Sequence, residues 1–280
     1  MNASINLLYG GNDYAFDGVV TSLLSVTKYC HRQLNVYVFT MDLSNKNPQW
    51  KPLNASHVAV FDEILHQANP QSRTILVDMT QAYLAELDGN ANESTSYTPF
   101  TLLRLLADKA QLPDKVLYLD TDIIAMRDIS ELWEQDITGS HFGAVLDHYG
   151  KVFISPKYIN AGVLLLNMPA LQQDHAWEQY RALIRTKKMK FSDQSALNEV
   201  SKGHIKYLAG KYNHQKRLRK DTVLRHFAKT IIWLPYFHTR NIKPWNETML
   251  HKYRIHYIDD ILSAYMTIKK NFVDKNQIKN

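Results

Sequence analysis

Short apolar runs alternate with segments of helical spacing along most of the chain. The runs at 5–8 and 35–40 end in polar or glycine residues, as strands do, and 19–26 repeats its apolar positions at the spacing of a helix. Further short apolar runs indicate strands at 58–61, 74–78, 115–119, 142–146 and 162–166. This alternation predicts an α/β chain with a mostly parallel central sheet. Two of the runs, 115–119 and 162–166, are the most continuous, so we expect central strands there.

Two polar segments interrupt the alternation. Residues 42–54 are irregular and contain several Asn and Pro, and residues 88–99 turn to Gly, Asn, Ser and Thr, so both are expected to be loops. A helix is expected over 100–110, where leucines recur at helical spacing. The last part of the chain is a helix-like tail with basic ends. We therefore expect an α/β domain over 1–246 and a helical C-terminal extension over 247–280.

Composition excludes several classes of protein. Apolar residues make up 45% of the chain and charged residues 21%, which excludes disorder and collagen-like repeats. Cys30 is the single cysteine, so a cysteine zinc site or an internal disulfide is excluded and a reducing, cytoplasmic location is favoured. The N-terminal segment lacks the features of a signal peptide, and no apolar run reaches the roughly 18 residues of a spanning helix. We expect a cytoplasmic protein that does not cross a membrane.

Two aspartates, Asp120 and Asp122, flank Thr121 directly after the apolar run 115–119. Spacing i, i+2 places both carboxylates on one face of an extended backbone. Ligands of α/β sheets bind at the carboxyl ends of the strands, where a carboxylate pair can hold a hard divalent cation. Such a cation would in turn hold the phosphate oxygens of a substrate.

Several motifs in a fixed order identify a family. They are Tyr-Gly-Gly-Asn-Asp-Tyr-Ala at 9–15, Lys-Val-Leu-Tyr-Leu-Asp-Thr-Asp at 115–122, Asp-Ile-Ser-Glu-Leu-Trp at 128–133, Asn-Ala-Gly-Val-Leu-Leu-Leu-Asn at 160–167, Phe-Ser-Asp-Gln-Ser-Ala-Leu-Asn at 191–198, and His238 with Lys-Pro-Trp at 243–245. In this order the motifs resemble glycosyltransferase family 8, the retaining UDP-sugar transferases with a GT-A fold. The resemblance extends over roughly residues 5 to 246.

The resemblance implies a metal site made of Asp120, Asp122 and His238. Two carboxylates and one imidazole suit Mn²⁺, and Mg²⁺ is an alternative. A cation that neutralises the charge developing on the diphosphate leaving group can replace a general acid. Lys243 would add a second positive charge against the same phosphates. A purely structural role for His238 is the alternative, and Asn241 stands where the family usually has Gly.

The resemblance also implies a nucleotide pocket in the first loop. We expect Tyr14 to stack on the uracil, with Asn12 or Asp13 bonding its edge, although an ordinary strand-to-helix turn explains the same residues. Arg104 lies among leucines and needs an anion or carboxylate partner; the family assigns it to the donor, and pairing with Asp108 or exposure to solvent is the alternative. The complete set of expected nucleotide contacts is Tyr9, Gly10, Gly11, Asn12, Asp13, Tyr14, Arg104, Asp120, Thr121, Asp122, Asn241 and Lys243.

The donor sugar is expected to lie against three small or polar positions, Asn160, Ala161 and Gly162. In the related enzymes an Asp, here Asp193, holds sugar hydroxyls, and a Gln, here Gln194, lies near the anomeric carbon. A retaining glycosidase uses two carboxylates about 5 Å apart, one of them the nucleophile. An amide is a poor nucleophile, so we expect front-face transfer, with a covalent intermediate as the alternative.

The expected reaction moves galactose or glucose from its UDP-sugar to a hydroxyl of a saccharide, glycolipid or glycoprotein. The basic segment 211–229 is either a solvated helix face or a contact with an anionic acceptor or with the inner face of the cell membrane. The tail at 253–270 either lies on a membrane or docks on the catalytic domain. No nucleic-acid-binding motif accompanies the charge, so nucleic acid is not an expected partner.

Two alternative functions use the same residues. A haloacid-dehalogenase-type, Mg²⁺-dependent phosphatase also carries Asp-x-Asp after an apolar strand, but that pattern requires Thr or Val where this chain has Ile124. A non-catalytic basic binding protein would use the net charge of +6 and leave the motifs without a role.

Overall fold

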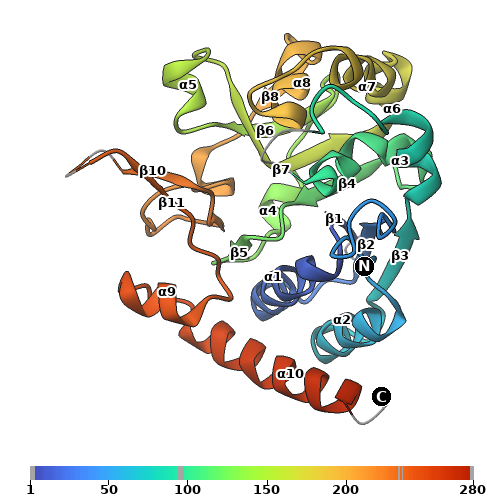
Figure 1. Cartoon of the computed structure of the whole chain (residues 1–280). Helices are drawn as coiled ribbons and strands as arrows, with labels where there is room; N and C mark the ends of the chain where they lie inside the picture. The colour runs from blue at the N-terminus through green and yellow to red at the C-terminus, as the bar shows by residue number, and fades with distance from the viewer. Residues whose placement is uncertain (1–3, 94–97, 233, 235, 278–280) are drawn as a thin grey trace.

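A seven-stranded sheet forms the centre of the protein (Figure 1). The computed structural model describes residues 4–93, 98–232, 234 and 236–277. The strand order is β3-β2-β1-β4-β7-β6-β8, and β7 alone runs antiparallel to its neighbours. The expected mostly parallel sheet is therefore confirmed. The strands are β1 (Ile5–Gly10), β2 (Leu34–Thr40), β3 (Arg73–Asp78), β4 (Lys115–Leu119), β6 (Phe142–Leu146), β7 (Ile159–Asn167) and β8 (Ile205–Tyr207).

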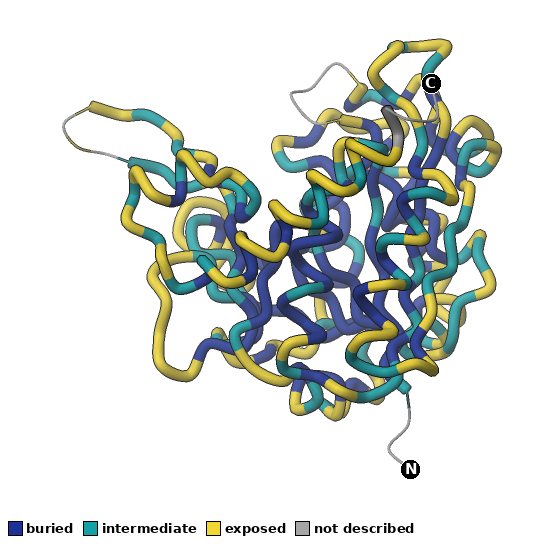
Figure 2. Tube along the Cα trace, turned by 90° about the horizontal axis from the view of Figure 1, so that it is seen from below, coloured by how far each residue is buried: buried dark blue, intermediate teal, exposed yellow. Residues whose placement is uncertain are grey.

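Helices cover both faces of the sheet. Because side chains alternate along a strand, Leu7 of β1 joins a core with α1 and α2, whereas Leu8 joins a second core with η2, α7 and α8. Figure 2 shows buried residues gathered in the middle of the molecule. The helices are η1 (Asp13–Ala15), α1 (Phe16–Tyr29), α2 (Ala55–Ala68), α3 (Thr80–Glu86), η2 (Pro99–Lys109), α4 (Ser130–Trp133), α5 (Gly150–Phe153), α6 (Met168–Gln173), α7 (Ala176–Thr186), α8 (Ser192–Val200), η3 (Gly210–Tyr212), α9 (Glu247–Lys252) and α10 (Asp259–Gln277).

Two short antiparallel ladders complete the fold. β5 (Ile123–Ala125) pairs with β9 (Leu224–His226), and β10 (Thr230–Ile232) pairs with β11 (His238–Arg240). The β10–β11 hairpin projects away from the central sheet (Figure 1).

The strand expected at 58–61 is wrong, because these residues belong to α2. The Asn54 side chain accepts a hydrogen bond from the backbone N–H of Ser56, and the backbone N–H of Asn54 donates to Nδ1 of His57. These reciprocal bonds start a helix at this point. The helix then buries Phe61 and Leu65, one turn apart, and a short apolar run alone does not distinguish such a helix from a buried strand.

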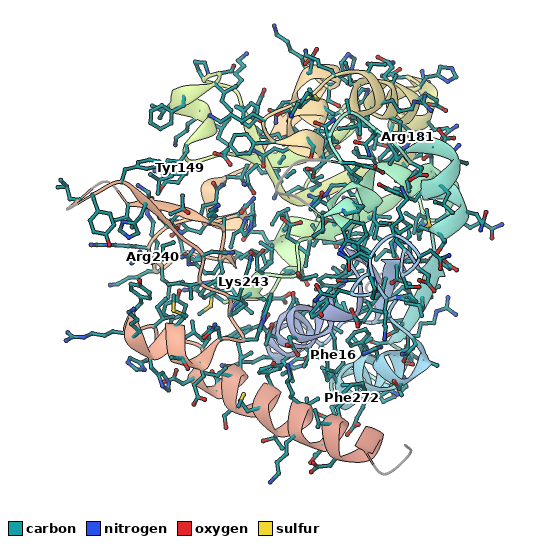
Figure 3. All side chains as sticks on the ribbon, viewed as in Figure 1. Phe16, Tyr149, Arg181, Arg240, Lys243 and Phe272 are labelled. Atoms are coloured by element: carbon teal, nitrogen blue, oxygen red, sulfur yellow. The ribbon has the colours of Figure 1, made fainter. Side chains whose placement is uncertain are left out.

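The tail packs against α1 and α2 of the α/β part of the chain. α10 buries Ile261 and Tyr265, and the ring of Phe272 stacks on that of Phe16 in α1, with centroids 4.6 Å apart (Figure 3). Lys28 of α1 also pairs with Asp260 at 2.5 Å. The apolar face of the tail is thus used inside the protein. Among the described helices, none has the length and apolar character needed to cross a bilayer.

The basic segment 211–229 is not a helix face, because it runs from the last residues of η3 through a loop into β9. Lys211 pairs with Glu131, and Arg225 donates to the backbone oxygen of His214. Only its middle part, 216–221, is continuously exposed. The segment therefore carries buried structure on both sides of a short exposed basic loop.

Candidate active site

Asp120 and Asp122 lie at the carboxyl end of β4, the middle strand of the sheet. The backbone N–H of Asp120 donates to the oxygen of Gly162 at 2.8 Å, which ties the motif to the start of β7. Asp120 is half-buried and Asp122 is buried. The strand-end position expected for the two carboxylates is confirmed.

The structure brings His226 to this pair. β9 pairs with β5 so that His226 lies opposite Ile123, the residue after Asp122. The Nε2 atom of His226 is 3.2 Å from Oδ1 of Asp122 and 3.9 Å from Oδ2 of Asp120. Its Nδ1 atom donates to Oδ1 of Asn213 at 3.0 Å. Because Nδ1 is bonded to Asn213, Nε2 is the ring nitrogen that faces the two carboxylates, and a cation among the three groups would take its lone pair.

The structure does not bring His238 to the aspartates. His238 lies on β11, where its Nδ1 atom is 3.0 Å from the backbone oxygen of Tyr236. Among the described residues, the possible metal-ligand group that contains Asp120 and Asp122 is completed by His226. Asn241, which follows β11, is exposed and has no positive φ, so its backbone does not require glycine.

Sequence reasoning missed His226 because His238 is closer in the chain to Lys243. The β10–β11 hairpin separates His226 from the segment that carries Lys243, and it carries His238 outward. The pairing of β9 with β5 is a long-range contact between three-residue strands. Strands this short leave almost no periodic signal in a sequence.

Arg104 is buried between two carboxylates. Its Nη2 atom is 2.7 Å from Oδ1 of Asp120, and its Nε atom is 3.1 Å from Oδ2 of Asp193. Burial alone would lower the pKa of Arg104, but Asp120, Tyr118 and Asp193 outweigh it and raise the pKa. The alternative pairing with Asp108 is wrong.

The actual partner of Asp108 is Arg181, whose Nη1 atom lies 2.6 Å away. This separate buried pair leaves Arg104 to the carboxylates at the sheet end.

Burial raises the pKa of Asp193 above its ordinary value, although Arg104 lowers it.

Lys243, which is labelled in Figure 3, adds a positive charge beside the Asp-x-Asp motif. Its Nζ atom is 2.7 Å from Oδ2 of Asp122. Burial alone would raise the pKa of Asp122, but His226 and Lys243 outweigh it and hold the pKa far below its usual range. Asp122 is therefore ionised across the physiological range, as a metal ligand must be.

The side chains of Asp120, Asp122 and His226 fit a divalent cation. Gly162 leaves free the space that Asp120 and His226 occupy. A Cβ at Gly162 would lie 2.3 Å from Cε1 of His226 and 3.0 Å from Oδ2 of Asp120. Any side chain at this position would displace one of the three ligands. The O, O, N donor set is one that Mn²⁺ and related ions accept.

A family model described as glycosyl transferase family 8 matches residues 6–249. The chain belongs to glycosyltransferase family 8. This match gives no support to a phosphatase or to a non-catalytic binding protein.

Curated relatives of this family 8 chain are bacterial glycosyltransferases. A putative glycosyltransferase of Haemophilus influenzae is 22% identical over 237 residues, which cover 75% of this chain and 63% of that protein. The chain thus spans just under two thirds of that relative. The lipopolysaccharide 1,3-galactosyltransferase of Salmonella typhimurium is 24% identical and covers 86% of this chain and 73% of its own. The lipopolysaccharide 1,2-glucosyltransferase of Escherichia coli is 26% identical over 49% of this chain and 46% of its own.

Solved structures share the fold. The galactosyltransferase LgtC, in a complex with donor and acceptor sugar analogs, superposes with a TM-score of 0.67 at 18% identity and covers 93% of this chain and 96% of its own. The glycosyltransferase GlyE of Streptococcus pneumoniae superposes with a TM-score of 0.64 at 19% identity, covering 97% of this chain and 64% of its own. The family 8 chain therefore has the GT-A fold.

The sugar-side residues of this family 8 chain form a hydrogen-bonded network. Asn160 donates from Nδ2 to Asp147 at 2.9 Å and accepts at Oδ1 from Asn213 at 2.8 Å. The Gln194 oxygen accepts from the backbone N–H of Ala161 at 3.1 Å. Sequence reasoning missed Asp147 and Asn213, which belong to no recognised motif. Asn213 connects this network to His226 and so to the aspartates.

The first loop lies beside the motif, because β1 and β4 are parallel neighbours. A Cβ at Gly18 of α1 would lie 2.7 Å from Cβ of Thr121, so this helix approaches the motif closely. The Tyr14 ring is 64% exposed and thus accessible for stacking. Tyr9, in contrast, is fully buried, and its hydroxyl lies 3.0 Å from that of Ser22. We assign Tyr9 to the core.

Other positions of the loop are constrained by the fold. A Cβ at Gly11 would lie 2.3 Å from Cβ of Ala15, and Gly10 packs next to Leu103. Asn12 donates from Nδ2 to the backbone oxygen of Gln49 at 3.3 Å. The Oδ1 atom of Asp13 is buried and has no hydrogen-bond partner among the described residues. Asp13 is therefore the loop residue with an unused acceptor.

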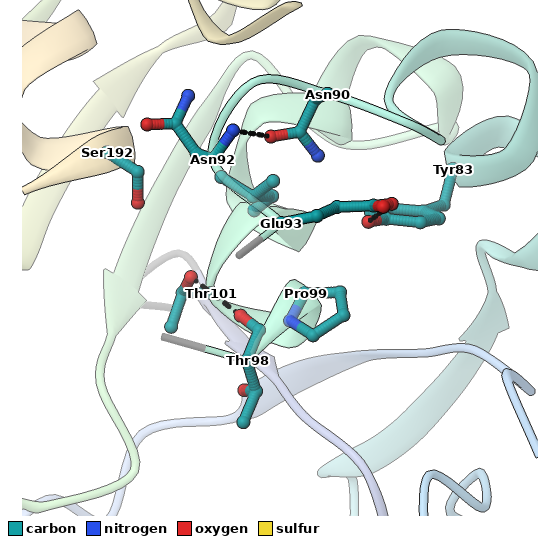
Figure 4. A pocket seen from close by; sticks show the side chains of 9 residues that line it. Tyr83, Asn90, Asn92, Glu93, Thr98, Pro99, Thr101 and Ser192 are labelled. Atoms are coloured by element: carbon teal, nitrogen blue, oxygen red, sulfur yellow. Dashed lines mark hydrogen bonds between the residues drawn. The ribbon is translucent and has the colours of Figure 1, made fainter. Parts of the chain in front are cut away.

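A small separate cavity lies beside η2 (Figure 4). Its volume of about 10 Å³ is near the lower limit for a single water molecule and far below that of a nucleotide sugar. The residues around it include Tyr83, Asn90, Asn92 and Ser192, and the backbone N–H of Asn92 donates to Oδ1 of Asn90. This cavity is not the donor site.

Proposed function

We propose that the chain transfers galactose or glucose from a UDP-sugar to a hydroxyl of a saccharide or glycoconjugate, with retention at the anomeric carbon. The supporting observation is the cluster of Asp120, Asp122 and His226 at the sheet end, with Arg104 and Lys243 against the carboxylates. We assign the catalytic unit to residues 1–246 and a helical extension to 247–280. Two relatives are named lipopolysaccharide galactosyl- and glucosyltransferases, which supports these hexoses and a lipid-linked saccharide acceptor.

Asp120, Asp122 and His226 would hold the divalent cation, Mn²⁺ with Mg²⁺ as an alternative, in place of the set with His238. When bound, the cation supplies positive charge against the diphosphate leaving group. The contact of Lys243 with Asp122 leaves its ammonium group beside the same position. Lys243 would therefore exchange its carboxylate partner for a phosphate oxygen of the donor. Such charge-assisted bonds to the leaving group strengthen as its charge develops.

Tyr14 and Asp13 would hold the base of the nucleotide. The exposed Tyr14 ring offers a stacking surface. The neighbouring Asp13 carboxylate is half-buried and would turn its unpartnered oxygen outward to accept from an N–H of uracil. Tyr9 takes no part in this pocket. Gly10 and Gly11 allow close approach of the backbone without direct contact to the base.

Asp193, Asn160 and Gln194 would hold the hexose. Transfer would occur on the front face: the bond from C1 to the UDP oxygen breaks as the acceptor oxygen bonds C1 on the same side. The acceptor proton passes to the departing phosphate oxygen. The amide oxygen of Gln194 would stabilise the positive charge on the sugar, and Arg104 would keep Asp193 ionised and oriented.

The decisive experiment measures hydrolysis of UDP-sugars without an acceptor, because slow transfer to water reveals the donor. We expect UDP-galactose or UDP-glucose to be hydrolysed with Mn²⁺ and not after chelation. Calorimetry should show that UDP binds far more tightly with Mn²⁺ than without it. Asp122→Asn should abolish both effects. If the affinity for UDP is the same with and without Mn²⁺ in both the wild type and Asp122→Asn, the proposal is contradicted.

The proposal includes a cytoplasmic location and a peripheral contact with the inner face of the membrane. The supporting feature is the exposed basic loop within 211–229, at Lys216, Arg217, Arg219 and Lys220. Each basic residue near an anionic surface contributes about 1 kcal/mol. Replacing all four by Gln should abolish co-sedimentation with anionic vesicles and leave UDP-sugar hydrolysis unchanged. Equal sedimentation of both proteins would exclude this contact.

A further inference from the structure

We propose that His141, Asp174 and His204 form a second metal site, selective for Zn²⁺ and similar transition ions. His141 precedes β6, His204 precedes β8, and Asp174 ends α6. β6 separates this group from the candidate active site, because Asp147 of the sugar-side network follows its other end. The inference is independent of the proposed transferase function.

The spacing of the ligand atoms fits a tetrahedral ion. Oδ2 of Asp174 lies 2.9 Å from Nε2 of His141 and 3.7 Å from Nδ1 of His204. All three ligand atoms are within 4.8 Å of one another. Zinc bonds of about 2.0–2.2 Å at tetrahedral angles require ligand atoms about 3.3 Å apart. The two measured distances bracket this value, and His204 is exposed enough to turn its ring.

The buried member of the group is held in position by its other ring nitrogen. The ring of His141 is almost fully buried, and its Nδ1 atom lies 2.8 Å from Oγ of Ser201. Ser201 in turn bonds the hydroxyl of Tyr180. Without an ion, Nε2 of His141 donates to Oδ2 of Asp174 at 2.9 Å, and Nδ1 accepts from the Ser201 hydroxyl. When an ion takes the place of the Nε2 proton, the Ser201 hydroxyl can instead accept from the Nδ1 proton, which leaves the Nε2 lone pair for the metal. Metal-binding histidines usually have such a hydrogen-bonded second nitrogen.

The backbone also holds two of the ligands together. The N–H of His141 donates to the backbone oxygen of His204 at 2.8 Å. The rings of the two histidines lie with centroids 4.6 Å apart. An open pocket of about 350 Å³, lined also by Gln179 and Val200, leaves room for an ion and its water ligands. The site is thus partly assembled before any ion binds.

The same atoms also resemble a Ser-His-Asp catalytic triad. Ser201 is fully buried, however, so no substrate can reach its oxygen. In Ser-His-Asp enzymes the serine contacts Nε2 of the histidine and the carboxylate contacts Nδ1. Here Ser201 contacts Nδ1 and Asp174 contacts Nε2. The group is therefore not a hydrolytic triad.

The ligand atoms of this site favour different metal ions from those of the candidate active site. Two imidazoles and one carboxylate favour Zn²⁺, Ni²⁺ or Cu²⁺, whereas two carboxylates and one imidazole also accept Mn²⁺. A second exposed group, His251, His256 and Asp259, offers similar atoms. Both of its histidines are exposed, so it lacks a buried imidazole that is held in position. It therefore serves as a matched control.

The test is Zn²⁺ titration by calorimetry of the full chain carrying Asp122→Asn, which weakens the first metal site. We expect one bound Zn²⁺. Adding His204→Asn or Asp174→Asn should weaken binding by about 100-fold or more, and adding Ser201→Ala by about tenfold. Adding His251→Asn should change nothing.

His204 and Asp174 are exposed, so their variants should fold, and circular dichroism checks this. In the chain with Asp122 intact, His204→Asn should keep Mn²⁺-dependent UDP-sugar hydrolysis within twofold. Absence of Zn²⁺ binding in the Asp122→Asn protein, or equal affinity after His204→Asn, would overturn the inference. Either result leaves the proposed transferase function untouched.

Discussion

The Nε2 atom of His226 lies 3.2 Å from Oδ1 of Asp122, although the two residues are far apart in the chain. The β5–β9 ladder produces this contact by placing His226 opposite Ile123. Asn213 orients the ring through its other nitrogen. His226 is therefore built into the Asp-x-Asp site before a ligand binds.

His226→Asn should weaken Mn²⁺-dependent binding of UDP by about 100-fold, because it removes the nitrogen that completes the metal-ligand set. His238→Asn is the matched control, since it changes the same residue type on the projecting hairpin. It should change the affinity by less than about threefold, as surface substitutions usually do. Calorimetric titration of UDP with and without Mn²⁺ measures both variants. The reverse order of effects would assign the metal to His238.

Gly162→Ala should abolish the same metal-dependent binding without changing any charge. The added Cβ would overlap Cε1 of His226 at 2.3 Å, and neither β7 nor buried His226 has space to move. Gly210→Ala is the control, because a Cβ there meets nothing within 4 Å. Thermal unfolding with and without Mn²⁺ plus UDP gives the readout: the ligand-induced rise in Tm should disappear for Gly162→Ala and persist for Gly210→Ala. A persistent rise in both would show that the site tolerates a side chain.

The sequence predicted the central part of this site because its signals are local. Asp120 and Asp122 follow a continuous apolar run, and such runs become buried strands whose ends share one edge of the sheet. The need of Arg104 for an anionic partner was also readable, since a guanidinium among leucines requires one. The structure identifies the partners as Asp120 and Asp193.

The remaining parts depend on contacts between distant segments. His226, Asn213 and Asp147 reach the site through short strands and turns, which no periodicity marks. The strand expected at 58–61 failed for a related reason: four apolar residues fit a buried strand or a helix, and the Asn54 cap decides for the helix. Local patterns thus predict which elements exist, whereas long-range pairing determines which polar side chains meet.

Gln194→Ala should slow transfer by about tenfold to 100-fold, since it removes one dipole that stabilises the charged sugar. The product should still have the retained configuration, because a front-face route needs no nucleophile at this position. Product stereochemistry by NMR and the rate of UDP release give the two readouts. An inverted product, or a sugar covalently trapped on Asp193, would contradict front-face transfer.

Acid should destabilise the contact between α2 and α10 through His57. The ring of this residue is buried between Phe16 and Phe272, and its Nδ1 atom accepts from the backbone N–H of Asn54. Burial lowers the pKa of His57, although Asp13 opposes the shift. The pKa of His57 in the folded protein is thus lower than its unfolded pKa of about 6.5, so the neutral ring contributes its full stability above the unfolded pKa. This contribution is lost as the pH falls through the pKa of the folded protein.

The test compares urea unfolding at pH 7.5 and pH 5.5 for the wild type and His57→Gln. Gln at this position retains a capping partner for Asn54 and cannot titrate in this range. The wild type should lose more unfolding free energy than the variant between the two pH values, because only the wild type takes up a proton at this position when it unfolds in acid. His31→Gln, at an exposed histidine, should keep the pH dependence of the wild type. If His57→Gln also keeps it, the acid sensitivity of the protein arises elsewhere.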